Sequence, residues 1–121
     1  MALIKVAEIN DMKEEQIWGA KIPFYEKRIY RDDKVAINLR RVPPREKIQS
    51  EGGYKLHTHD ESTEIVIVLK GKGVGHCGSD DLSHEAGDIL VIPPNTEHGS
   101  VSVEEEWTSL AIFIPPPKER Y

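Results

Sequence analysis

Short apolar runs, separated by turn-forming residues, dominate the chain. The clearest is Ile65-Val66-Ile67-Val68-Leu69, which follows Glu64 and precedes a glycine-rich stretch. Runs of this length, rich in Val and Ile, predict β-strands. Strands are expected over residues 25–30, 35–42, 54–59, 64–70, 73–77, 88–92, 98–103 and 108–114. Many short strands with frequent turns are typical of an all-β sandwich or barrel.

Proline, glycine and aspartate mark the turns between these strands. Turns are expected at residues 31–33, 43–44, 71–73, 78–81, 93–95 and 115–117. One short helix is predicted over residues 10–18, because Asn10 and Asp11 are good N-cap residues and acidic positions follow. Gly19 is expected to end it.

Two of the predicted strands are apolar on both faces. If Glu64, Val66 and Val68 point to the interior, then residues 65, 67 and 69, which are also aliphatic, point outward. The run at 108–114 repeats this pattern. A strand that is apolar on both sides is covered on both sides, either by the N-terminal segment or by another subunit. We prefer the second reading, a homodimer formed by packing sheet on sheet.

Metal-ligand side chains gather between residues 57 and 98. Alternate residues of a strand share a face, so His57 and His59 point the same way and can hold one ion between them. The polar residues 60–63 allow a hairpin that returns Glu64 to the two histidines. A third histidine, His98, follows the proline turn at 93–95.

The spacing of these residues resembles the two motifs of the cupin family. His57, His59, Glu64 and Gly71 match the first motif, although Glu51 occupies its leading glycine position. In the second motif the matching residues are Gly87, Pro93 and His98, whereas Asn95 replaces an inner glycine and Ser102 replaces the final asparagine. Asparagine tolerates the left-handed backbone that glycine would supply.

The resemblance implies a double-stranded β-helix, the jelly-roll barrel of cupins, with at most one short N-terminal helix. It implies a single cupin domain over residues 1–121, with the motifs at about 52–102. It also implies that His57, His59, Glu64 and His98 bind one divalent transition metal per chain. This ligand set favours Fe(II) or Mn(II), and Zn, Ni, Cu or Co also fit it. Such a set leaves two positions of a six-coordinate ion open, as in catalytic sites.

Composition narrows the partners. A chain of 121 residues is long enough to bury a core, and its net charge of −5 with scattered basic residues argues against a nucleic-acid or acidic-membrane partner. The single cysteine, Cys77, excludes an intramolecular disulfide and fits a reducing compartment. We found no signal segment and no apolar run long enough to span a bilayer. A small-molecule substrate and a cytoplasmic location are therefore expected.

Other residues near the motifs have alternative readings. One of Arg40 and Arg41 is expected to point inward, where it can act as a clamp for a carboxylate or phosphate, with a surface salt bridge as the alternative. Cys77 is expected to be a small barrel residue rather than a nucleophile activated by His76. His76 and His84 match no ligand position and are expected to lie outside the pocket. The segment 43–53 is predicted to be a surface loop at the barrel mouth, with a lid or a partner contact as alternatives.

Two classes of function fit these features. The first is a metal-dependent enzyme that acts on a small oxygenated substrate, in the manner of a dioxygenase. The second is a non-catalytic cupin that binds or senses a small ligand or metal. Sugar isomerase and decarboxylase activity remain alternatives within the enzyme class, because the cupin scaffold hosts many reactions. No general base is identifiable from the sequence.

Overall fold

The computed structural model describes residues 2–17, 23–46 and 57–118. Within these ranges it contains one short helix and seven strands. In chain order these are α1 (Val6–Ile9), β1 (Glu14–Gln16), β2 (Tyr25–Arg31), β3 (Ala36–Val42), β4 (Thr63–Cys77), β5 (Asp80–Glu85), β6 (Ile89–Ile92) and β7 (His98–Ile114). The prediction of an all-β protein is confirmed.

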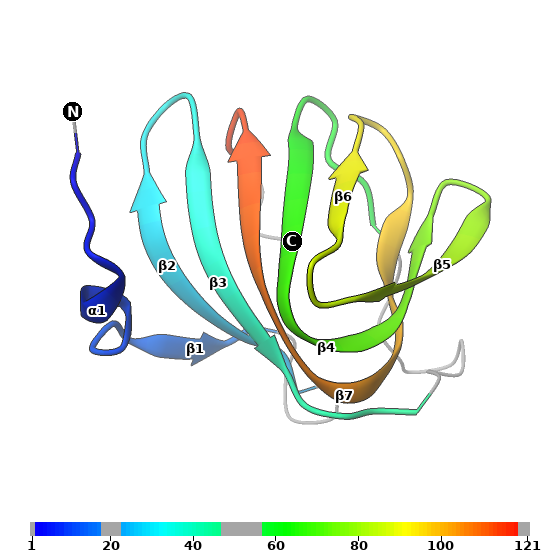
Figure 1. Cartoon of the computed structure of the whole chain (residues 1–121). Helices are drawn as coiled ribbons and strands as arrows, with labels where there is room; N and C mark the ends of the chain where they lie inside the picture. Colours follow the sequence, from blue (N-terminus) through cyan, green and yellow to red (C-terminus); the bar gives the residue numbers. More distant parts are fainter. Residues whose placement is uncertain (1, 18–22, 47–56, 119–121) are drawn as a thin grey trace.

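The strands form one antiparallel sheet that curls around an interior. Its strand order is β1-β2-β3-β7-β4-β5, and β6 also pairs with β4. The two longest strands, β4 and β7, pair along most of their length and bend together, which carries the sheet around the barrel (Figure 1). In the described part of the chain no pairing joins β1 to β5, so hydrogen bonds do not close the sheet.

One predicted turn lies inside a strand instead, and one predicted break between two strands is absent. Residues 71–73 continue β4, and residues 103–108 continue β7, so four predicted strands are two long ones. The reason is a series of register shifts between β4 and β7, which bend a strand without ending it. Gly71 lies at such a bend with φ of +82°, and a Cβ there would collide with the carbonyl oxygen of Glu106.

Two further elements differ from the sequence prediction. The helix spans Val6–Ile9 rather than residues 10–18, and Glu14–Gln16 instead pair with β2 as β1. The polar segment Asp80–Glu85 was not predicted as a strand, yet it pairs with β4 as the edge strand β5. Edge strands carry polar residues because one of their sides faces solvent.

Part of two predictions falls outside the described residues. Of the predicted strand at 54–59, residues 54–56 are not described; His57 forms an isolated bridge with His98, and His59 is not in a strand. Of the predicted loop at 43–53, the structure describes only residues 43–46.

The core lies inside the curled sheet and confirms the predicted alternation. Glu64, Val66 and Val68 of β4 are buried, whereas Ile65 and Ile67 between them are partly exposed. The main apolar cluster comprises Phe24, Val42, Val66, Val68, Ile92, Val103 and Trp107. In the described residues, no helix is long and apolar enough to cross a membrane.

Candidate metal centre

The structure brings the four predicted ligands together. Glu64 lies on β4, His98 begins β7, and His57 and His59 precede β4. One possible ligand atom from each residue lies within 4.8 Å of those of the other three, and all but His57 are buried. We call these four residues the tetrad. A group of this composition and spacing can hold a metal ion.

Backbone hydrogen bonds position the three imidazoles. The amide of His57 donates to the carbonyl of His98 at 3.0 Å, and the amide of His98 donates to the carbonyl of His57 at 2.9 Å. The amide of Asn95 donates to the carbonyl of His59 at 2.9 Å. Asn95 has φ of 57°, the left-handed conformation expected of a residue that replaces glycine. The proline turn thus fixes both histidine segments.

The Glu64 carboxylate has two distinct sides. Its Oε2 accepts a hydrogen bond from Arg40 Nη1 at 3.0 Å. Its Oε1 lies 3.1 Å from His98 Nε2 and 3.6 Å from His59 Nε2. Ligands at right angles around an ion with bonds of about 2.1 Å are about 3 Å apart, so these separations fit one metal ion.

His98 gives a direct test of whether a cation fits here. Its Nδ1 lies 2.8 Å from the carbonyl oxygen of Thr96, which can only accept, so Nδ1 carries the donated proton. In a neutral imidazole Nε2 then presents a lone pair to the Glu64 carboxylate. Two acceptors 3.1 Å apart repel each other unless a proton or a metal ion balances them. The donor set therefore fits a metal.

Arg40 supports Glu64 from behind. Its side chain is buried, with Nε 3.5 Å from Oε2 of the buried Glu26, and its guanidinium lies over the rings of Phe24 and Phe113. Arg40 is therefore the member of the Arg40–Arg41 pair that points inward. It binds two carboxylates of the protein, and these salt bridges are buried rather than on the surface as the alternative reading expected.

Arg41 points outward and pairs with Glu14 and Glu106 on the surface. Glu26 was not predicted as part of the site. It lies opposite Arg40 in the register of β2 and β3, and strand patterns in the sequence do not reveal that register.

The surroundings shift the protonation of two tetrad members. Burial, together with the neighbouring His98 and His59, lowers the pKa of His57 to about 3. Burial by itself would raise the pKa of Glu64, but the Arg40 guanidinium beside it lowers this pKa well below its usual range. A neutral imidazole and an ionised carboxylate are the forms that bind metals.

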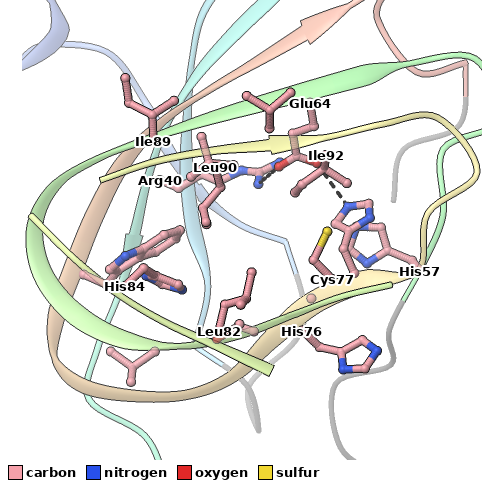
Figure 2. Close-up of a pocket in the computed structure, with 18 of the residues that line it drawn as sticks. Arg40, His57, Glu64, His76, Cys77, Leu82, His84, Ile89, Leu90 and Ile92 are labelled. Carbon is pink, nitrogen blue, oxygen red and sulfur yellow. Dashed lines mark hydrogen bonds and ion pairs between the residues drawn. The ribbon is translucent and has the colours of Figure 1, made fainter. Parts of the chain in front are cut away.

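A cavity of about 300 Å³ opens beside the tetrad. His57, Glu64 and His98 line it, and its walls are mostly apolar. Two predictions about its lining are wrong, because His76 and His84 both border it. In Figure 2, His84 lies at the end of the cavity opposite His57, and Cys77 is also among the lining residues. The position of His84 was missed because β5 was not predicted as a strand. In the structure, β5 directs His84 toward the interior.

Comparison with known proteins identifies the fold family. A family model described as "Cupin domain" matches residues 41–115. The chain is a cupin. The expected jelly-roll fold is therefore confirmed, and the tetrad lies on the histidines and the glutamate that match the two cupin motifs.

Solved structures agree with this assignment at the level of the fold. KdgF from Halomonas sp. has a TM-score of 0.72 at 16% identity, over 88% of this chain and 91% of that chain. An RmlC-like cupin from Shewanella frigidimarina has a TM-score of 0.73 at 17% identity, over 90% of this chain and 88% of that chain. A predicted oxalate decarboxylase from Thermotoga maritima has a TM-score of 0.71 at 20% identity, over 89% of this chain and 96% of that chain. No curated protein sequence matches the chain.

The buried Arg40 gives a stability prediction. Arg40→Met leaves Glu64 buried without its cation and Glu26 with only the half-exposed Arg28 at 3.7 Å, so we expect a loss of about 3–5 kcal/mol in the free energy of unfolding. Arg41→Met removes ion pairs near the surface and a contact of the guanidinium with the Tyr25 ring, and should cost only about 1 kcal/mol. Urea denaturation of both variants checks this, and similar losses for the two would contradict it.

The His57 pKa gives a pH prediction for the metal-free protein. The unfolded chain gains a proton on His57 near pH 6.5, whereas the folded chain gains it near 3, so stability falls as pH drops through this interval. One such group can change the free energy of unfolding by at most about 1.4 kcal/mol per pH unit. His57→Gln should flatten the dependence of the urea midpoint between pH 7 and 4.5.

His76→Gln is the matched control for this measurement. A hydrogen bond with Asp81 raises the pKa of His76, so its contribution has the opposite sign. Removing it should leave the loss of stability at low pH intact. Parallel slopes for the wild-type protein and His57→Gln would show that His57 is not held neutral in the fold.

Proposed function

We propose that this cupin is a metal-dependent enzyme of the dioxygenase type, acting on a small oxygenated molecule inside the barrel. The observation that carries the proposal is the tetrad, which faces one end of a mostly apolar cavity of about 300 Å³. Enclosed, largely apolar pockets with a few convergent polar groups are typical of small-molecule sites. We propose His57, His59, Glu64 and His98 as the ligands of one divalent ion, with Fe(II) or Mn(II) favoured.

The residues around the tetrad have separable roles. The three imidazoles and Glu64 would hold the ion, which when bound supplies Lewis-acid and one-electron chemistry. Arg40 orients the Glu64 carboxylate through its Oε2 and leaves Oε1 toward the imidazoles. Thr96 fixes the proton of His98 on Nδ1. Leu90, Ile92 and Val103 border the cavity and exclude water from the bound substrate.

The charge balance favours an anionic substrate group at the tetrad. Among the described residues near the site, the buried charges are the Arg40 guanidinium and the carboxylates of Glu26 and Glu64. With neutral imidazoles, a divalent ion leaves one positive charge in excess. A substrate that binds through a singly ionised pair of oxygens would neutralise it, because buried charges are stable only when paired.

The first test is metal content. Protein purified without chelator should carry close to one transition ion per chain, and His59→Ala should lower this occupancy sharply because it removes one of the four ligands. His84→Ala is the matched control, since this histidine lines the same cavity but lies outside the tetrad. Full occupancy in a variant with alanine at residues 57, 59 and 98 would refute the ligand assignment.

The same preparations distinguish enzyme from sensor. We expect the metal-loaded protein to consume dioxygen with at least one member of a panel of catechols, flavonols, thiols and keto acids, and the triple alanine variant to consume none. Carbon dioxide release or sugar isomerisation without dioxygen uptake would favour the decarboxylase or isomerase alternative. Metal-dependent binding without turnover of any compound would favour the sensing module.

We further propose that the protein is a homodimer, formed through the outer face of the sheet. Pairing across β3, β7, β4 and β6 aligns two rows of aliphatic side chains there. They are Ile37, Ile112, Ile65 and Val91 in one row, and Leu39, Leu110, Ile67 and Ile89 in the other. A contiguous apolar face of this kind typically marks an interface.

The described N-terminal residues do not cover this face, which favours a second subunit. α1 has no buried residue, and Leu3 and Val6 are each 80% exposed. In Figure 1, α1 and β1 lie at the β2 edge, away from β4 and β6. The single-domain organisation and the cytoplasmic location inferred from Cys77 complete the proposal, and both stay predictions.

Light scattering tests the dimer. At tens of micromolar the protein should have twice the 13.7 kDa mass of one chain. Placing lysine at both Ile89 and Val91, which are 62% and 60% exposed, should yield monomers because it buries two charges in the contact. Leu3→Lys, outside the face, should leave the mass unchanged. A monomeric wild-type protein would refute the proposed interface.

A further inference from the structure

The end of the cavity opposite His57 carries a second pair of polar rings. His84 from β5 and Trp107 from β7 both line the cavity, with ring centroids 5.4 Å apart and planes inclined at 51°. Neither residue belongs to the tetrad. Figure 2 shows His84 projecting into the cavity, across from the tetrad end.

Each of these rings has an unsatisfied polar atom. His84 Nδ1 and Trp107 Nε1 are buried, and neither has a hydrogen-bond partner among the described residues. Buried polar atoms in native proteins nearly always have a partner, which can be a protein group, an ordered water or a ligand. Two such atoms on adjacent rings in one cavity indicate that something polar occupies this end.

The backbone makes room for the His84 ring. Gly75 of β4 lies beneath it, and a Cβ there would approach His84 Nε2 to 3.1 Å, closer than most side chains come. Aliphatic side chains, including Val66, Leu90 and Ile92, also line the cavity, and in Figure 2 Leu90 lies between His84 and the tetrad end. The cavity therefore has two polar ends and an apolar middle.

The polar pair suits an uncharged group. Burial lowers the pKa of His84, so at neutral pH its ring has one donor and one acceptor nitrogen. The indole N–H of Trp107 adds a donor. Among the described lining residues, Arg40 is the only guanidinium or ammonium group, and it already binds Glu26 and Glu64. A carboxylate or phosphate at this end would have no counterion.

We propose that His84 and Trp107 form a second anchoring point, which hydrogen-bonds a hydroxyl group of the bound molecule. A hydroxyl can accept from Trp107 Nε1 and donate to His84 Nδ1, satisfying both atoms. The ligand class is then a compact molecule with an apolar middle and an uncharged hydroxyl remote from the tetrad. This inference extends the proposed function to its substrate class, but the anchoring point itself requires no metal.

The test uses phenol and toluene as probes of the metal-free protein. They differ by a hydroxyl in place of a methyl group, so the ratio of their dissociation constants measures the hydrogen bonds. We expect phenol to bind more tightly than toluene in the wild-type protein. The variants Trp107→Phe and His84→Leu each place an apolar side chain of similar size at the site and remove the polar ring atom. In each variant the ratio should fall about tenfold, the loss expected for one buried hydrogen bond.

Leu82→Met is the matched control, because it changes an apolar lining residue and should preserve the ratio. Titrations followed by amide chemical shifts give the constants and verify that each variant is folded. Absence of phenol binding at millimolar concentration, or an equal ratio in wild type and both variants, would overturn the anchoring point. Because no metal is present, a tetrad that fails to bind metal would refute the proposed function and leave this result unaffected.

Discussion

The organisation of the barrel interior depends on one buried guanidinium. Arg40 lies between Glu26 and Glu64, and burying any of these charges alone would be strongly unfavourable. Pairing them links β2, β3 and β4 across the barrel. On the intervening β7, the small Ser109 lies opposite Arg40 and Phe113 lies opposite Glu64, and the guanidinium extends over the Phe113 ring to reach the carboxylate. The three strands are thus fixed in register by charge as well as by backbone hydrogen bonds.

This arrangement explains why the tetrad has metal-binding geometry before any ion enters. Arg40 occupies one oxygen of Glu64, so the other faces His59 and His98. Thr96 fixes the tautomer of His98 and directs a lone pair to the same point. Supporting groups of this kind orient metal ligands and maintain their affinity. The cost is a cluster of acceptors that only a cation relieves.

The tetrad was predicted because His57, His59, Glu64 and His98 match the two cupin motifs. The motif spacings can be read along the chain without knowing how the strands pair. Glu26 and His84 were missed because their positions depend on pairing with β3 and β4. The strand ends were misplaced where bulges let β4 and β7 continue through glycine and polar residues, which usually mark turns.

The two faces of β4 couple the proposed assembly to the proposed site. Glu64 and Val66 face the cavity, while Ile65 and Ile67 belong to the outer apolar face. Covering that face with a second subunit would bury β3, β7 and β4 on both sides, and so restrict the strand movements that could separate Arg40 from its carboxylates. A sheet buried on both faces opens only with the whole fold. Dimerisation would therefore stabilise the orientation of Glu64 without placing any partner residue in the site.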